Sequence, residues 1–310
     1  MIVYRGDPSD WEPPPHGAAV AIGVFDGVHL GHRRVLDALD ACDPHLARTA
    51  MTFGTHPAAI LAPDGAPRRL STLAQRFELF REAGIEYVAV LDFDEEMRDM
   101  ASEAFVDRYL VGGLDARFVA VGKGFRFGRD ASGTTGTLAE LGAVRGFDVE
   151  VVPIEALNGS EIRSTAIRER LEAGDVTGAA AMLGRAYEME GIVVPGDGRG
   201  RRFGIPTANI SFPAVLTVPL PGVYAVTAII DGAAHPAVAN LGTRPTFDGT
   251  DQVLEVHVLD LDRDLYGKHL KVLFVERIRD ERRFASVDDL LAQIHSDIAT
   301  AAAMFGERTS

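Results

Sequence analysis

At 310 residues, with 46% hydrophobic and 25% charged residues, the chain has the size and composition of two globular domains, which excludes a disordered or fibrous protein. The formal net charge of −14 argues against a nucleic-acid partner, because affinity for a phosphate backbone depends on Lys and Arg. The sequence begins without a secretory signal, and no apolar run approaches the roughly 20 residues that cross a bilayer. With a single cysteine, Cys42, these features predict a cytoplasmic protein that needs no membrane.

The first half of the sequence alternates short apolar runs with helical patterns, which is typical of a parallel α/β sheet. Strands are expected at 18–25, 48–53, 87–93, 118–121 and 149–152, and helices at 31–40, 72–84, 102–110 and 164–173. A capping box from Thr137 to Glu140 predicts one more helix. Residues 1–184 are therefore expected to form one α/β domain with a parallel sheet.

From Tyr187 the pattern changes to short strands, expected at 187–194, 223–230, 235–239, 254–258 and 270–275. Asp231-Gly232 predicts a type I′ hairpin turn, because both positions need positive φ. An amphipathic helix capped by Ser286 follows, with an apolar face made of Leu290, Leu291, Ile294 and Ile298. Residues 185–310 are therefore predicted to be a small antiparallel β-barrel with a terminal helix, which makes the whole chain α/β + β.

The segment from Gly23 to His32 leaves the first strand and enters the first helix. Its glycines let the backbone approach a ligand, and the start of the helix offers unpaired N–H groups to an anion. His29 and His32 could hydrogen-bond the phosphates of ATP as charge shifts in the transition state. The alternative is that both are ordinary histidines beside a turn.

A second group of polar residues begins the helix expected at 164–173. The hydroxyls of Ser164 and Thr165, the helix N–H groups and the guanidinium of Arg168 would together form a phosphate cradle. The alternative is an ordinary helix cap with a solvent-exposed arginine.

Taken together, these two motifs resemble the nucleotidyltransferase superfamily. Within that superfamily, the sequence is similar to the bacterial FMN adenylyltransferases, which form the N-terminal half of bifunctional riboflavin kinase/FAD synthetases. The matching residues are Phe25-Asp26-Gly27, His29 and His32, Thr52-Phe53, His56-Pro57, Val121-Gly122, Phe125 and Phe127-Gly128. The resemblance implies a Rossmann-like domain in which His29, His32 and Arg168 act in catalysis and Gly23, Phe25, Gly31, Ser164 and Thr165 bind nucleotide. It also implies that Asp64 and Phe127 lie near the flavin, although structural roles for both stay open.

Three positions depart from the pattern of that family. Arg163 stands where a serine is usual, Thr55 replaces the proline before His56, and Gly124 replaces an amide or acid that would approach the flavin. The polar group missing at Gly124 would remove one hydrogen bond to the flavin, of about 0.5–1.5 kcal/mol. This loss would weaken FMN binding by up to about tenfold, without abolishing FMN adenylylation.

A basic glycine loop in the second half could wrap phosphates. Gly196 to Gly204 places three arginines among glycines, and Thr207 and Asn209 offer hard oxygen ligands suited to Mg²⁺ held jointly with phosphates. The alternative is a flexible surface turn followed by an edge strand. On the strand at 254–258, the carboxylate of Glu255 could act as a general base. The alternative is that Glu255 is an ordinary solvent-facing side chain of the strand.

This region is similar to the riboflavin kinase signature, including Asn240 to Phe247 and Asp264 to Gly267. The resemblance implies that Glu255 deprotonates the ribityl 5′-hydroxyl of riboflavin, while Gly198, Gly200, Arg202 and Gly204 bind ATP and Thr207 and Asn209 bind Mg²⁺. The predicted function is riboflavin to FMN and then FMN to FAD, with ATP in both steps. The alternatives are a kinase with an inert or differently specific first half, and a non-catalytic flavin- or nucleotide-binding regulator. Predicted partners are small molecules, with homo-oligomer formation left open.

Overall fold

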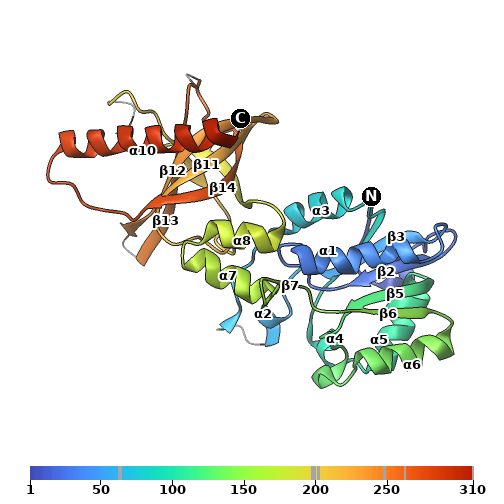
Figure 1. The fold of residues 1–310 in the computed structure, drawn as a ribbon. Helices are drawn as coiled ribbons and strands as arrows, with labels where there is room; N and C mark the ends of the chain where they lie inside the picture. Colours follow the sequence, from blue (N-terminus) through green and yellow to red (C-terminus); the bar gives the residue numbers. More distant parts are fainter. Residues whose placement is uncertain (62–64, 197–199, 201–202, 247–248, 262, 309–310) are drawn as a thin grey trace. The chain divides into compact units, whose positions relative to one another are not determined.

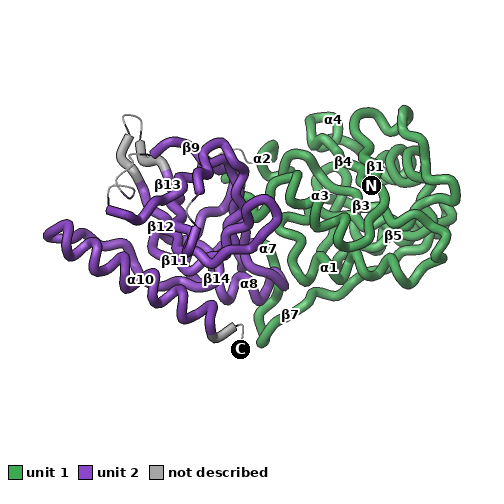
Figure 2. Tube along the Cα trace, turned by 90° about the horizontal axis from the view of Figure 1, so that it is seen from above, with its two compact units in different colours: residues 1–164 green, residues 165–310 purple. Residues whose placement is uncertain are grey.

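The computed structural model describes residues 1–310 except 62–64, 197–199, 201–202, 247–248, 262 and 309–310. The chain forms two compact units, residues 1–164 and 165–310 (Figure 2). The first contains a parallel sheet and the second a closed barrel (Figure 1), so the predicted fold class is confirmed. A functional boundary at Gly184 stays a prediction. Among the described residues, no helix combines the length and the apolar character that crossing a bilayer requires.

The sheet of the first unit has six parallel strands in the order β1-β4-β3-β2-β5-β6. They are β1 (Ile2–Tyr4), β2 (Ala18–Ile22), β3 (Ala47–Phe53), β4 (Tyr87–Leu91), β5 (Ala116–Gly122) and β6 (Asp148–Val152). From β2 the chain first adds strands on one side, through β3 and β4, and later on the other, through β5 and β6. The order thus reverses beside β2, and in open α/β sheets ligands bind at the carboxyl ends of the strands at such a point.

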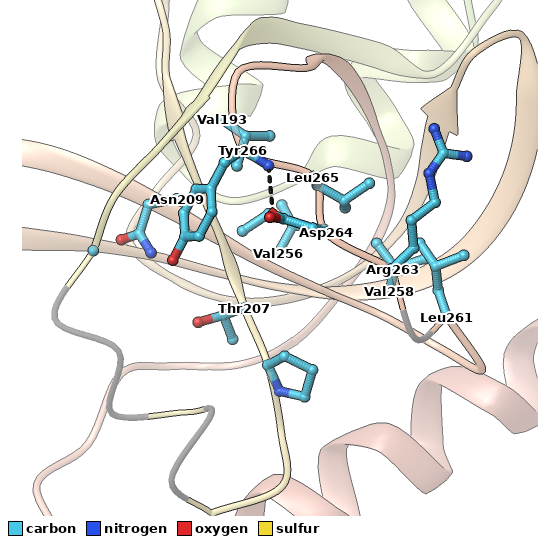
Figure 3. A pocket seen from close by; sticks show the side chains of 13 residues that line it. Val193, Thr207, Asn209, Val256, Val258, Leu261, Arg263, Asp264, Leu265 and Tyr266 are labelled. Carbon is cyan, nitrogen blue, oxygen red and sulfur yellow. Dashed lines mark hydrogen bonds between the residues drawn. The ribbon is translucent and has the colours of Figure 1, made fainter.

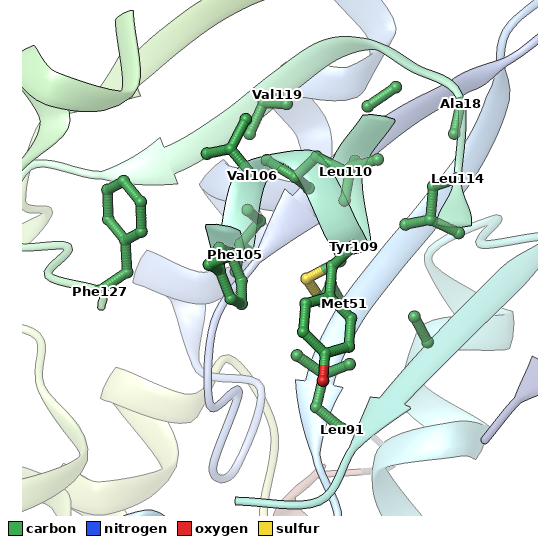
Figure 4. Close-up of a cluster of buried hydrophobic side chains, with 14 of the residues drawn as sticks. Ala18, Met51, Leu91, Phe105, Val106, Tyr109, Leu110, Leu114, Val119 and Phe127 are labelled. Carbon is green, nitrogen blue, oxygen red and sulfur yellow. The ribbon is translucent and has the colours of Figure 1, made fainter. Parts of the chain in front are cut away.

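Side chains of β2 alternate between two apolar cores, one on each face of the sheet. Ala18, Val20 and Ile22 belong to the core that contains Phe105, Tyr109 and Phe127 (Figure 4). Ala19 and Ala21 belong to the opposite core, with Phe25 and Phe80. Burial on both faces explains why the strand sequence is continuously apolar.

The helices of the first unit are α1 (Leu30–Asp37), α2 (Ala58–Leu61), α3 (Leu73–Glu82), α4 (Glu95–Asp99), α5 (Ser102–Phe105), a π-helix at 106–113, and α6 (Thr135–Arg145). The capping box of α3 is present as predicted, between Thr72 and Gln75. The capping box expected at Thr137 is wrong, because Thr134 caps α6 and accepts a hydrogen bond from the Thr137 backbone N–H at 3.1 Å. The strand expected to reach Phe25 ends at Ile22, since Phe25 takes a positive φ.

The second unit is a closed antiparallel barrel in the order β10-β13-β12-β11-β14-β9. Its strands are β9 (Tyr187–Val194), β10 (Ala208–Ser211), β11 (Gly222–Ile230), β12 (Ala233–Thr246), β13 (Gly249–Val258) and β14 (His269–Arg279). Asp231 and Gly232 have φ of 50° and 84°, which confirms the predicted turn between β11 and β12.

Among the described residues, the helices that accompany the barrel are α7 (Ser164–Glu172), α8 (Val176–Leu183) and α10 (Val287–Arg308). The last of them lies along the barrel (Figure 1), where Ile298 and Ala301 pack with Val223 and Val238. The apolar face predicted for the terminal helix is therefore the face that covers β11 and β12. Helix α8 packs against β9 and β14, so it belongs to the barrel unit rather than to the parallel sheet.

Candidate functional site

The first candidate site begins where β2 ends, at the reversal of strand order. Residues 23–29, called here the 23–29 turn, include Phe25, Gly27 and Val28, whose φ values are 52°, 79° and 37°. A positive φ costs a residue other than glycine on the order of 1–3 kcal/mol, and such residues persist only where their surroundings fix them. The turn is therefore held in place by its neighbours.

The two predicted histidines lie side by side at the start of α1. His29 is the N-cap residue, 5% exposed, and its Nδ1 accepts a hydrogen bond from the His32 backbone N–H at 3.2 Å. The two rings are stacked, with centroids 3.6 Å apart and planes at 16°. Because Nδ1 acts as an acceptor, a neutral His29 carries its proton on Nε2 and can donate it to a ligand.

The side chains of Asp26, Ser71 and Ser164 stabilise the 23–29 turn through hydrogen bonds. The Asp26 carboxylate accepts from the backbone N–H of Leu70 at 2.9 Å and of Ser71 at 3.3 Å. The Ser71 hydroxyl accepts from the Gly27 N–H at 2.9 Å, and the Ser164 hydroxyl donates to the Asp26 carbonyl at 3.1 Å. Ser164, predicted from a distant motif, therefore reaches this turn, and Asp26 supports the turn although sequence reasoning gave it no role.

Two predicted glycines of this site have close neighbours that explain the absence of a side chain. A Cβ on Gly23 would lie 3.2 Å from the Phe25 ring, and one on Gly31 would lie 3.2 Å from the His29 ring. Phe25 itself is 1% exposed and packs edge-on against Phe80. Phe25 therefore anchors the turn to the hydrophobic core.

The remaining residues predicted for the first half are placed as follows. Phe127 is 7% exposed within the apolar core, and the more accessible Phe125 stacks on it with ring centroids 5.4 Å apart. Asp64 lies outside the described residues. Thr165 and Arg168 follow on α7 in the second unit, where the Arg168 guanidinium donates to the Thr165 hydroxyl at 3.3 Å.

The three departures from the family pattern also have defined surroundings. Arg163 pairs with Glu161 at 2.6 Å, so part of its added charge is balanced. Thr55 and Gly124 are exposed, and no atom lies within 4 Å of a Cβ built on Gly124. A larger residue at position 124 would therefore fit without a clash.

The second candidate site is a row of polar residues across three strands of the barrel. The backbone register pairs Glu255 with Asn209 on one side and with Asn240 on the other. Their strand neighbours Leu254 and Val256 are buried inside the barrel, so this row faces outward, toward α10. The register thus brings together Glu255 and Asn209, which the sequence predicted separately, and adds Asn240.

Two cavities meet at this row. The larger, about 380 Å³, lies between the barrel and α10; Glu255, His257 and Asn240 line it, with an apolar wall of Phe203, Val223, Val238, Phe284, Leu290 and Leu291. The smaller, about 170 Å³, is lined by Gly196, Arg263, Asp264 and Tyr266 among others (Figure 3). Thr207 and Asn209 line both cavities. A group held between these two side chains would therefore contact ligands in both cavities.

Only part of the predicted glycine loop is described. Gly198 and Arg202 lie outside the described residues, whereas Gly204 has a φ of 74°. The Gly200 carbonyl accepts hydrogen bonds from the backbone N–H groups of Phe203 at 3.0 Å and Ile205 at 2.9 Å. A Cβ on Gly200 would collide with the Ile205 carbonyl and crowd the Thr207 hydroxyl, so only glycine lets the backbone pass this close to Thr207.

The helix side of the larger cavity carries polar residues that sequence reasoning missed. Asp297, which is 3% exposed, pairs with Arg279 at 2.7 Å and accepts from Gln293 at 2.7 Å. On the barrel side, the His257 Nδ1 lies 2.8 Å from the Pro206 carbonyl. An aspartate among the apolar positions of the final helix is the signal that could have identified Asp297.

Comparisons with known proteins cover both units. A family model for FAD synthetase matches residues 12–166, and one for riboflavin kinase matches residues 183–305. A bifunctional riboflavin kinase/FMN adenylyltransferase from Escherichia coli (strain K12) is 39% identical over 309 residues, which are 99% of this chain and 98% of that protein. One from Bacillus subtilis (strain 168) is 35% identical and covers 90% of each chain. A Streptococcus pneumoniae crystal structure, described as a macrolide-efflux protein, has a TM-score of 0.89 at 29% identity and covers 97% of this chain and 99% of that one.

Proposed function

The chain belongs to the bifunctional riboflavin kinase/FMN adenylyltransferase family, and we propose that its two sites divide two consecutive reactions between them. It phosphorylates riboflavin to FMN and adenylylates FMN to FAD, with ATP as donor in both steps. The resemblance found in the motifs is thereby confirmed. The assignment of individual residues is the proposed part, and for the kinase it rests on the register that pairs Asn209 with Glu255.

In the kinase reaction, riboflavin occupies the larger cavity, whose apolar wall suits a flat aromatic ring. Glu255 takes the proton of the ribityl 5′-hydroxyl, whose oxygen then attacks the γ-phosphorus of ATP as ADP leaves. ATP occupies the smaller cavity, beside the glycine loop. Thr207 and Asn209 line both cavities, which supports a role for them beside the transferred phosphoryl group.

The donor set at this junction fits Mg²⁺. The Thr207 hydroxyl and the Asn209 amide would offer two oxygens to the ion, and ATP phosphates and water would supply the other ligands. When bound, Mg²⁺ would neutralise phosphate charge.

In the adenylyltransferase reaction, an FMN phosphate oxygen attacks the α-phosphorus of ATP and pyrophosphate leaves. His29 donates from Nε2 to the transferring group, with His32 stacked beside it, and the N–H groups at the start of α1 face the phosphates. Ser164, Thr165 and Arg168 remain predicted ligands of the triphosphate. The accessible Phe125 suits contact with the flavin better than Phe127, while Asp64 remains a predicted flavin contact.

One assay tests both assignments and the alternatives. The protein is incubated with riboflavin and MgATP, and the products are identified by chromatography. FMN followed by FAD supports the proposal, FMN alone favours a kinase with an inert or differently specific first half, and neither product favours a non-catalytic regulator. A cytoplasmic location and the absence of nucleic-acid partners remain predictions, and homo-oligomer formation stays open.

The barrel unit should act alone when α7 and α8 are kept. A fragment of residues 165–310 should phosphorylate riboflavin at nearly the parent rate, because the proposed kinase groups lie within it. A fragment of residues 185–310 should unfold at lower urea, since it loses α8 from β9 and β14 and the hydrogen bond from the Leu220 N–H to the Leu171 carbonyl at 2.9 Å. Urea denaturation and FMN formation check both fragments. Equal stability would show that α7 and α8 are dispensable.

Replacing Gly31 with alanine should separate stability from activity. Alanine in α1 favours the helix by about 0.5–1 kcal/mol, whereas its Cβ would press on the His29 ring 3.2 Å away. We therefore expect an unchanged or raised unfolding midpoint together with at least tenfold slower FAD formation. Gly136→Ala, in the first turn of α6, is the matched control, because the nearest atom to its Cβ is 3.5 Å away. Normal FAD formation by Gly31→Ala would contradict the proposed position of His29.

A further inference from the structure

Arg76 is a buried cation that neither reaction uses directly. It lies on α3 and is 3% exposed, on the same buried face of the helix as Leu79 and Phe80. Its Nη1 donates to the Val24 carbonyl at 2.9 Å and to the Thr52 hydroxyl at 3.0 Å. The Thr52 hydroxyl also donates to the Val24 carbonyl, at 3.0 Å. The Val24 carbonyl is thus held twice, immediately before the positive φ of Phe25.

Burial and the neighbouring charged groups determine the pKa of the Arg76 guanidinium. Asp26 faces the guanidinium from the 23–29 turn, and Arg69 and His56 line the same small cavity. Burial lowers the pKa of Arg76 to about 10, an effect that Asp26 opposes and Arg69 reinforces. Arg76 is therefore cationic at neutral pH. Burial of a charge is unfavourable, and an apolar side chain would fill this face of α3 without that cost, so packing alone does not account for an arginine here.

We propose that Arg76 is a positioning residue for adenylyl transfer, which holds the 23–29 turn through the Val24 carbonyl and thereby places His29 and the first N–H groups of α1. Arg76 itself does not contact the substrate; the residues of the 23–29 turn do. Because a displacement of about 1 Å at a reacting centre can cost about 10²-fold in rate, a loosened turn should slow chemistry more than it weakens ATP binding. The inference rests on the proposed role of the first unit in FAD formation.

The test compares Arg76→Met, which keeps the length but removes donors and charge, with Arg76→Lys, which keeps the charge without the planar fork. Arg81→Met, an exposed position on the same helix, is the matched control. The only tryptophan, Trp11, is buried in the core of the first unit, so its fluorescence during urea unfolding reports the folded fraction of that unit. Each full-length variant is assayed for FAD formation from FMN and MgATP, and for FMN formation from riboflavin.

We expect Arg76→Met to lower kcat for FAD formation by about 10²-fold and Arg76→Lys by about tenfold, with KM for ATP changed less than threefold and FMN formation unchanged. A folded Arg76→Met with less than a tenfold loss overturns the proposal. If Arg76→Met does not fold, Arg76→Lys decides: a kcat within twofold of the parent overturns the proposal, and a larger loss with unchanged KM supports it. Failure of the parent protein to form FAD would instead refute the proposed function of the first unit.

Discussion

Replacing Glu255 with glutamine should lower FMN formation from riboflavin by about 10²–10⁴-fold, the usual cost of removing a general base. Glutamine has nearly the same shape, so the backbone register with Asn209 and Asn240 should survive. FAD formation from supplied FMN should continue at the parent rate, because the proposed adenylyltransferase turn lies in the first unit. The measurement is the initial rate of each product with saturating MgATP.

Glu281→Gln is the matched control for this prediction. Glu281 lines the same cavity and loses the same charge, but it has no proposed role in proton transfer. We expect it to change FMN formation by less than tenfold. If Glu255→Gln keeps more than a tenth of the parent rate, Glu255 does not act as the general base, and the cavity would be a binding site whose chemistry depends on another group.

Replacing His29 with asparagine should lower FAD formation by about 10²–10³-fold, the range observed when one donor to a transition state is removed. Asparagine is a favoured N-cap residue, so α1 should keep its start. The change removes the Nε2 donor and the ring stacked on His32. FMN formation from riboflavin should not change. The assay measures kcat for FAD formation with supplied FMN, after Trp11 fluorescence has confirmed that the first unit is folded.

His45→Asn provides the comparison for this variant, since His45 is an exposed histidine of the same unit and has no proposed role. It should form FAD at the parent rate. A folded His29→Asn variant within tenfold of the parent would show that His29 serves the fold rather than the transfer of the adenylyl group. His32 would then be the next candidate for the donor.

Local pattern was enough to predict most of the elements and both groups of motifs. Apolar runs and turn residues indicated a parallel sheet followed by a barrel, because the pattern of one strand or helix reflects which of its own faces is buried. The same reasoning placed His29 and His32 at one helix start, since three residues span less than one turn. Prediction was weaker at boundaries, as at Thr134, where two threonines could each have capped the helix.

Only the tertiary structure decided which distant residues meet. Nothing in the local sequence pairs Glu255 with Asn209 and Asn240, because strand register depends on how all six strands close the barrel. Arg76 was passed over for a related reason: a charged residue on a helix is normally expected in solvent, and its burial under Val24 results from how α3 packs on the sheet. The sequence by itself determined the two-part fold and the chemistry of the motifs. The geometry that turns those motifs into sites depended on long-range packing, whose free energy is shared among many contacts and leaves no signal in any short segment.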